Sequence, residues 1–452
     1  MLHAMPYVYE PLDTSRKQIR LVRFGPPLSH TSRRSPDSQR RTLLTHLAKR
    51  FSATVQHLHV FDTEGKNSDS IVLELVTYNF EDVPNFTALS YEWGPSDDVV
   101  GIMIGQNQTQ IRRNLYNFLD RYQSFTNRAD YLWIDQICID QQSIIERNHQ
   151  VMLTADIYSG AEEVLIWAGH DPSAPVAFKS MEEIVSACNE HVNDRNFFGE
   201  GVDLILHQQL RPGNIDAIDK FYGLSYWTRH WIAQEIALAK HRTIMYSDEL
   251  MPWQTLNSFV RFLGISKSLT QLSSAPDSLI DFVAGATENS DRARWIHAMA
   301  FGERSRCQNT QDKIFGIQSV FRSHLRVDVD YGRSSREIFE QAAHVYISYE
   351  PSYAAGVSTL ATPVDLSRGL TQLATGMRLV DRSNTQADAF WECVGRLASR
   401  IESIQWLARN FPWSWTKSKS FVMRTIKEFL TGHEDEELQP DLDAIEKSFQ
   451  ET

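Results

Sequence analysis

Three short apolar segments alternate with two longer amphipathic segments between Thr87 and Gly169, and no other feature of the sequence constrains the fold as strongly. Short apolar runs are typical of buried strands, and amphipathic runs between them are typical of helices that cover a sheet. The pattern therefore predicts an α/β fold with a mostly parallel sheet flanked by helices. Polar and acidic side chains follow the expected strands, at the edge where open parallel sheets bind ligands. These strands are Ala88–Trp93, Tyr131–Ile134 and Val164–Trp167.

The sequence on either side of this unit predicts further strands and helices. Thr109 is a candidate cap for a helix whose apolar residues recur at spacings of three and four over 111–122. Thr228 is a candidate N-cap for a second helix, from about Arg229 to Lys240. Additional strands are expected at 19–24, 71–78 and 242–246, which are apolar and rich in β-branched residues.

Charge and cysteine usage exclude several classes of protein. The formal net charge of −12 argues against bulk electrostatic binding to nucleic acid or to an anionic membrane. The four cysteines stand far apart, so they predict neither a zinc site nor a disulfide framework. The sequence contains no apolar run of membrane-spanning length and no signal-peptide core at its start. We therefore expect a cytoplasmic protein without a structural metal, a membrane span or a nucleic-acid partner.

Glu235 is the candidate catalytic residue. It stands four residues after Trp231, so the two side chains share one face of the expected helix. A carboxylate beside an indole loses solvation, which raises its pKa and lets it act as an acid or base near neutrality. The alternative is a glutamate on the helix surface that pairs with Arg229 or another neighbour.

Candidate substrate-binding residues stand at the ends of the expected strands. Tyr91, Trp93 and Gly94 follow the first strand, and Asp135 ends the second. Asp135 could contact a ligand, or it could cap the turn that follows it. The neighbouring Glu146, Arg147 and Gln150 are expected to have structural roles, with Gln150 donating to a backbone group.

At these residues the sequence resembles the fungal heterokaryon incompatibility (HET) domain family. Four blocks that carry the resemblance occur in the family's order. They are ALSYEWG at 88–94, LWIDQICIDQQSIIERNHQV at 132–151, IYSGAEEVLIWAG at 157–169 and YWTRHWIAQEIALA at 226–239. The resemblance implies a role in non-self recognition and programmed cell death, a form of innate immunity, with a non-self partner that the sequence does not identify.

The HET family in turn resembles Toll/interleukin-1 receptor (TIR) domains, which implies a TIR-like, flavodoxin-like sheet. Trp231 and Glu235 have the spacing of the TIR motif Trp-Cys-x-x-Glu, although Ile232 stands at the cysteine position. In enzymatic TIR domains that glutamate supports cleavage of the nicotinamide–ribose bond of NAD. Carried over to this chain, the resemblance applies to Glu235 alone, and it implies NAD as a possible substrate with no cofactor needed. Trp231 joins Tyr91, Trp93, Gly94 and Asp135 as a candidate substrate-binding residue, and either Trp93 or Trp231 could form a wall for the nicotinamide. The resemblance also implies self-association, which is compatible with catalysis because TIR-like enzymes often need assembly to become active. The alternative function is a non-catalytic module that works by self-association alone.

Four regions are expected along the chain. The first is a lead-in with a basic, polar insertion, and the second is the HET-like α/β domain. A helical extension with a capping box at Ser334 and Glu337 follows, and then a helical C-terminal region with an acidic tail. Their boundaries are 1–70, 71–253, 254–350 and 351–452.

Overall fold

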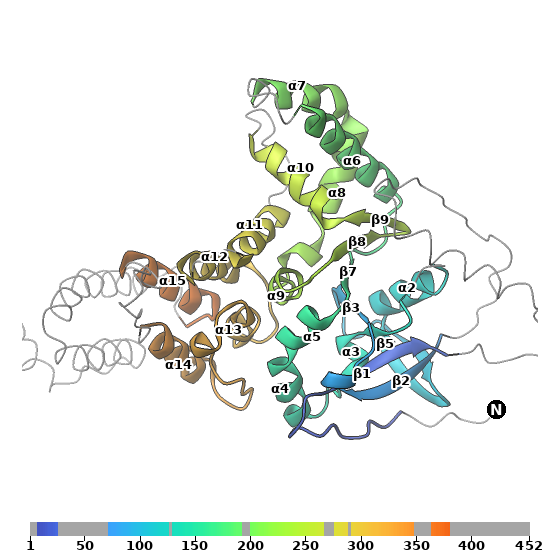
Figure 1. The fold of residues 1–452 in the computed structure, drawn as a ribbon, viewed down its shortest axis with the longest axis vertical. Coiled ribbons are helices and arrows are strands. Elements are labelled where there is room, and N and C mark those ends of the chain that lie inside the picture. Colours follow the sequence, from blue (N-terminus) through green and yellow to red (C-terminus); the bar gives the residue numbers. More distant parts are fainter. Residues whose placement is uncertain are drawn as a thin grey trace, which may run out of the picture.

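A nine-stranded sheet runs through the part of the chain that the structure describes (Figure 1). The computed structural model describes residues 7–25, 71–125, 129–191, 199–265, 275–287, 291–347 and 363–379. The basic insertion and the acidic tail expected from the sequence lie outside these residues. The order of the strands across the sheet is β5-β4-β2-β1-β6-β3-β7-β8-β9. They are β1 (Gln18–Phe24), β2 (Val72–Asn79), β3 (Thr87–Tyr91), β4 (Val99–Ile104), β5 (Asn107–Arg112), β6 (Leu132–Trp133), β7 (Glu163–Trp167), β8 (Arg242–Tyr246) and β9 (Glu249–Pro252).

The centre of the sheet is parallel and its flanks are mixed. Strands β6, β3, β7 and β8 pair in parallel, whereas β1 pairs antiparallel with both β2 and β6. Every residue of β3 is buried, as expected for a parallel strand covered on both faces. The predicted α/β class is confirmed, and so are the strands predicted at 19–24, 71–78 and 242–246.

Helices cover the sheet and extend beyond it (Figure 1). Helix α9 lies between the sheet and α11, and it contacts β3, α5 and α11. Five of the helices are α2 (Arg113–Tyr122), α3 (Asp135–Cys138), α4 (Ile144–Met152), α5 (Thr154–Gly160) and α9 (Ile232–Ala237). The others are α6 (Ala174–Glu190), α7 (Glu200–Gln209), α8 (Pro212–Tyr222), α10 (Trp253–Ile265), α11 (Ala275–Thr287), α12 (Asp291–Arg304), α13 (Asp312–Phe315), α14 (Ser335–Ile347) and α15 (Pro363–Gly376).

Two predicted helix starts are wrong and one is confirmed. Thr109 caps no helix, because it lies in β5 and pairs with Ile102 of β4. Thr228 belongs to a 3-10 turn, η3 (Ser225–Thr228), so α9 begins three residues later than predicted and is shorter. At the start of α14, Ser334 and Glu337 form the predicted capping box, with the Glu337 carboxylate accepting from the Ser334 amide and hydroxyl at 2.8 and 2.7 Å.

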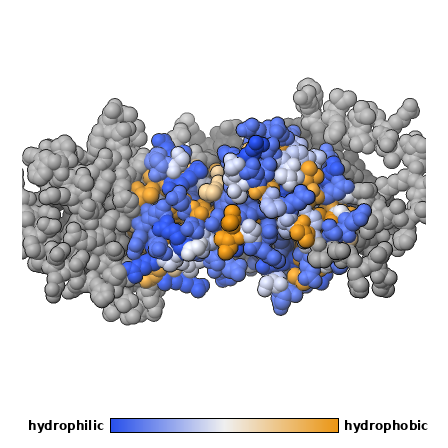
Figure 2. All heavy atoms as spheres, turned by 90° about the horizontal axis from the view of Figure 1, so that it is seen from below, coloured by the Kyte–Doolittle hydropathy of each residue, from blue (hydrophilic) through white to orange (hydrophobic). Residues whose placement is uncertain are grey.

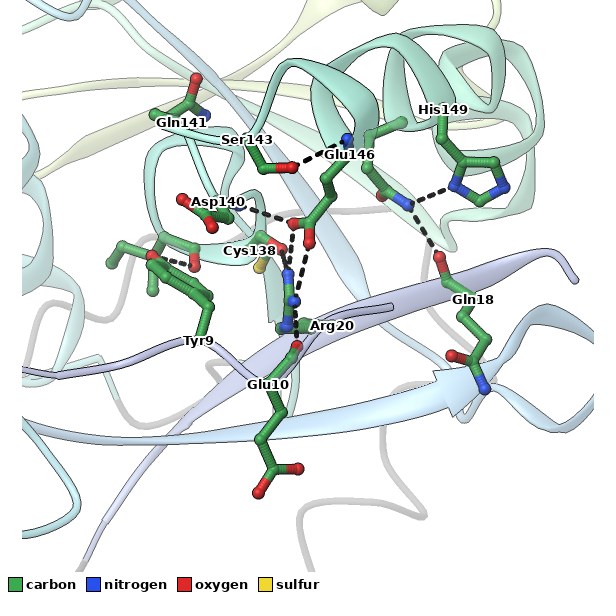
Figure 3. Close-up of polar contacts among 12 residues, drawn as sticks. Tyr9, Glu10, Gln18, Arg20, Cys138, Asp140, Gln141, Ser143, Glu146 and His149 are labelled. Atoms are coloured by element: carbon green, nitrogen blue, oxygen red, sulfur yellow. Dashed lines mark hydrogen bonds and ion pairs between the residues drawn. The ribbon is translucent and has the colours of Figure 1, made fainter. Parts of the chain in front are cut away.

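A buried ion pair joins β1 to the segment that follows β6 (Figure 3). The guanidinium of Arg20 makes two hydrogen bonds to the Glu146 carboxylate, at 2.5 and 3.0 Å. It also donates to the backbone oxygens of Cys138 at 2.9 Å and Glu10 at 2.6 Å. Asp140 donates its amide to Glu146 at 2.6 Å. The pair therefore fixes the lead-in, the segment after β6 and α4 to one strand.

The remaining contacts of this region confirm the structural roles predicted for Glu146 and Gln150. Gln150 donates its side-chain amide to the backbone oxygen of Gln18 at 2.8 Å, which ties α4 to β1 a second time. Burial alone would raise the pKa of Glu146. The hydrogen bonds from Arg20 and Asp140 outweigh it and hold that pKa below its ordinary value, so the carboxylate stays ionised.

On the face of the molecule drawn in Figure 2, the described residues are mostly hydrophilic with separate apolar spots. Ile144 and Ile145 at the start of α4 are 58% and 73% exposed, next to the buried ion pair. None of the helices in the described part of the chain combines the length and the apolarity needed to cross a lipid bilayer.

Replacing Arg20 by methionine tests how much the fold depends on this ion pair. The Arg20→Met variant leaves the Glu146 carboxylate buried without its cation, so we expect the free energy of unfolding to fall by about 3–5 kcal/mol. Chemical denaturation at pH 7 measures it. Lys17→Met is the matched control, because Lys17 pairs with Asp156 at 2.7 Å on the surface, and it should cost less than about 1 kcal/mol. Equal costs for the two variants would contradict the prediction.

Candidate functional site

Glu235 lies on α9, where that helix packs against the middle of β3. Its carboxylate accepts a hydrogen bond from the hydroxyl of Ser90 at 2.5 Å, and the glutamate is only 5% exposed. Ser90 is fully buried in β3, between apolar neighbours on the same strand. The alternative of a surface glutamate is therefore wrong, although the expected pairing with Arg229 is present.

Tyr226 extends the hydrogen bonds around Glu235. Its hydroxyl lies 2.6 Å from the Ser90 hydroxyl, so Ser90 connects the tyrosine with the carboxylate. The 3-10 turn η3 carries this tyrosine shortly before Arg229. Burial, with the nearby Glu235 charge, raises the pKa of Tyr226 so that its hydroxyl stays protonated at any physiological pH.

Arg229 supplies positive charge beside the carboxylates. A guanidinium nitrogen of Arg229 lies 3.9 Å from a carboxylate oxygen of Glu235, which is an ion-pair distance rather than a hydrogen bond. That nitrogen, Nη1, is buried and has no hydrogen-bond partner among the described residues. Burial alone would lower the pKa of Arg229, but the negative charges of Glu235 and Asp135 outweigh burial and raise it.

The surroundings of Glu235 raise its pKa to about 7. Burial is the largest cause, and the charge of Asp135 acts in the same direction. Arg229 and the hydrogen bond from Ser90 act in the opposite direction. A carboxyl group with this pKa can both accept and donate a proton near neutrality, which is the property required of a general acid or base. The largest cause of the raised pKa is burial of Glu235 where α9 packs against β3, and no indole is among its causes.

Asp135 and Trp93 form the outer part of the site. The indole nitrogen of Trp93 donates to one Asp135 oxygen at 2.8 Å, and the Gln136 amide donates to the other at 2.7 Å. Asp135 is therefore the first residue of α3, where it accepts from the next amide and also holds the indole of Trp93, which follows β3. The guanidinium of Arg112 lies 4.8 Å from the centroid of the Trp93 ring, on its face. Burial raises the pKa of Asp135, and Arg229 opposes that rise.

Tyr91 and Gly94 shape the same edge of the sheet. Tyr91 is buried, and burial together with the Asp135 charge raises the pKa of Tyr91 well above its ordinary value. Gly94 has a φ of +77°, a conformation that favours glycine. Its backbone oxygen accepts from Arg112 at 2.5 Å, so the glycine positions the arginine that stacks on Trp93.

Trp231 makes its polar contact away from Glu235. It lies near Asp312 at the start of α13: burial raises the pKa of that carboxyl, while the Tyr331 hydroxyl, which donates to it at 2.6 Å, and the Trp231 indole oppose the rise. The structure therefore brings five of the six candidate residues to one region of the sheet and directs the indole of Trp231 toward the helical region.

Sequence reasoning missed Ser90 and Tyr226, and it treated Arg229 only as a competing explanation for Glu235. The available signal was a serine inside a strand that is otherwise apolar, since a buried hydroxyl requires a hydrogen-bond partner. Among the described residues, no group of three or more histidine, cysteine, aspartate or glutamate side chains could hold a metal ion.

Comparison with known proteins finds similarity over the segment that carries most of these residues. Residues 86–235 match the family model for heterokaryon incompatibility protein (HET), and the match ends at Glu235. The chain is 24% identical over 263 residues to heterokaryon incompatibility protein 6, OR allele, of Neurospora crassa. That alignment covers 49% of this chain and 38% of the relative, so the chain spans well under half of the relative's length. No solved structure matches the chain. The ordered sequence blocks and the family match agree that residues 86–235 form a segment similar to the HET family.

Proposed function

We propose that this chain acts in fungal heterokaryon incompatibility, the process after which its Neurospora relative is named, and that it does so by hydrolysing NAD at the nicotinamide–ribose bond. The observation that carries the catalytic part is Glu235, buried beside Ser90 and Arg229 with a pKa of about 7. The resemblance to enzymatic TIR domains, which rests on the spacing of Trp231 and Glu235, supports the choice of NAD.

The proposed chemistry fits the charges of the site. Breaking the glycosidic carbon–nitrogen bond builds positive charge on the ribose, and a carboxylate held near the ribose stabilises that charge. Near pH 7 a substantial fraction of Glu235 is ionised, and Asp135 adds a second carboxyl group close to Arg229. Trp93, whose indole nitrogen is held by Asp135, offers a ring face on which nicotinamide could stack.

Hydrolysis of NAD by the purified 452-residue chain tests the catalytic proposal. We expect the rate of nicotinamide release, measured by chromatography, to be at least about 100-fold lower in the Glu235→Gln variant. The amide of that variant can neither ionise nor exchange a proton. Glu74→Gln is the matched control, since Glu74 pairs with Arg23 at 2.7 Å on the far side of β1 and should leave the rate unchanged. Absence of turnover by the wild type, both as a monomer and when concentrated or cross-linked, would contradict NAD hydrolysis.

The pKa of Glu235 predicts a pH-dependent stability. This pKa is about 7 in the folded protein, above the ordinary 4.5. The contribution of Glu235 to the free energy of unfolding is therefore complete below about pH 4.5 and is lost as the pH rises through about 7. The loss corresponds to about 3 kcal/mol. We expect the free energy of unfolding of the wild type, minus that of Glu235→Gln, to fall by this amount between about pH 4.5 and pH 8. A pH-independent difference would show that Glu235 titrates normally.

Regulated expression in a fungal host tests the biological part of the proposal. We expect growth arrest with the wild type and normal growth with Glu235→Gln at equal protein abundance. Arrest by both proteins would instead favour a non-catalytic module that works by self-association, which is the alternative function. Normal growth with abundant folded wild-type protein would count against both.

A further inference from the structure

The helical region holds the backbone on both sides of Arg229. Arg229 forms a parallel bridge with Arg306, which follows α12 in the chain. The His230 amide donates to the backbone oxygen of Arg306 at 2.8 Å, and the Arg306 amide donates to the backbone oxygen of Thr228 at 2.5 Å. The position of Arg229 therefore depends on a segment that lies far along the chain from it.

His230 fills the space between this bridge and the helical region. Its side chain is completely buried, and its Nδ1 atom lies 2.7 Å from the hydroxyl of Ser305. The ring stacks against Phe301 at a centroid distance of 6.1 Å. It also lies directly on Gly316, where a Cβ atom would come within 2.5 Å of the imidazole. Burial and the nearby Lys313 charge lower the pKa of His230 to about 3, so the ring is neutral at physiological pH.

Lys313 holds the segment that carries Ser305, on the side of the contact between His230 and Ser305 that faces α12. Its ammonium group donates to the backbone oxygen of Gly302 at 2.7 Å and to that of Ser305. Lys313 lies on α13, while Gly302 belongs to the last turn of α12. The end of α12 is thus held rigidly where Ser305 meets His230.

We propose that His230 and Ser305 are positioning residues, which hold Arg229 opposite Glu235 from the helical region. This proposal deepens the proposed function, because Glu235 is the catalytic group of that function. The Nη1 atom of Arg229 makes no hydrogen bond within the described residues, and it lies 3.9 Å from the carboxylate. The place of the guanidinium beside Glu235 is therefore set by its backbone rather than by a direct bond to the carboxylate.

The charge of Glu235 is the quantity that this positioning controls. The groups that face Glu235 are Ser90 on β3, Tyr226 on η3, Arg229, and across the site Asp135 and Tyr158. Arg229 is the cation among them. Because the attraction between charges falls with their separation, moving Arg229 about 1.5 Å away at an effective dielectric constant of about 20 raises the pKa of Glu235 by about one pH unit.

Substitutions of Ser305 test the proposal without any need for catalysis. The readout is the pKa of Glu235, obtained from the pH dependence of the unfolding free energy of each protein relative to the same protein carrying Glu235→Gln. We expect Ser305→Ala to move this pKa upward by about one pH unit, toward the value in Arg229→Gln. We expect Ser305→Thr, which keeps the hydroxyl, to leave it at about 7.

A matched control separates positioning from general loss of stability. Ser180 is also a buried serine, and its hydroxyl donates to the backbone oxygen of Val176 at 2.7 Å on α6, away from the site. Ser180→Ala should lower stability without moving the pKa of Glu235. If Ser305→Ala fails to fold, Ser305→Cys replaces it, because a thiol keeps the shape and weakens the hydrogen bond.

Two outcomes overturn the proposal. The first is a pKa of Glu235 that stays at about 7 in folded Ser305→Ala or Ser305→Cys. The second is a rise in the pKa of Glu235 in Ser180→Ala that equals the rise in Ser305→Ala. Failure of the proposed function is recognised separately, since a wild type that releases no nicotinamide still yields the titration of Glu235. If the wild type hydrolyses NAD, the pH profile of the rate should move upward in Ser305→Ala by the same amount as the pKa of Glu235. The profile of Ser305→Thr should match that of the wild type.

Discussion

The buried pair of Arg20 and Glu146 is the interaction on which most of the sheet depends. Burying two charges is costly unless each remaining donor and acceptor is satisfied. Here the guanidinium also serves the backbone oxygens of Glu10 and Cys138, and the carboxylate also serves the amide of Asp140. The fully bonded arrangement exists only when the lead-in, β1 and the segment after β6 are all in place. A pair of this kind selects one arrangement of distant segments, whatever its net contribution to stability.

At the candidate site, burial has the opposite outcome for the charge of a glutamate. Around Glu146, hydrogen bonds outweigh burial and keep the carboxylate charged. Around Glu235, a single hydroxyl and an arginine at ion-pair distance do not outweigh burial, so the pKa rises to about 7. Two glutamates of similar exposure thus have different chemistry because their partners differ. Incomplete compensation of a buried charge is typical of functional sites and unusual in purely structural ones.

Much of the fold could be predicted from the sequence, because buried strands carry a local signal. The segments around Ala88, Leu132 and Val164 are short, apolar and separated by amphipathic stretches, and all three are strands in the structure. Helix starts were harder to predict. Thr109 has the chemistry of a cap, but six backbone pairings between β4 and β5 outweigh that preference, and such pairings depend on a turn that periodicity does not reveal.

The candidate site could be predicted only in part, for the same reason. Glu235 and Asp135 stand next to recognisable strands or motifs, so their sequence context identifies them. Ser90 carries no such signal beyond its polarity, and its role depends on α9 crossing β3. The contact between His230 and Ser305 joins positions that no local pattern relates. Spacing along one helix also placed Trp231 beside Glu235, whereas its indole lies near Asp312, whose pKa it influences.

The order of the strands determines how much of the chain is needed to form the complete sheet. The family segment 86–235 contains β3, β4, β5, β6 and β7, but β1 and β2 lie between β4 and β6 in the sheet. Residues 86–235 on their own would contain the sheet as two separate pieces, and Glu146 would lack its partner Arg20. The segment by which relatives are recognised is therefore smaller than the unit that can fold. Insertions and fusions in such proteins should be tolerated outside β1 to β9 far more readily than at the borders of the recognised segment.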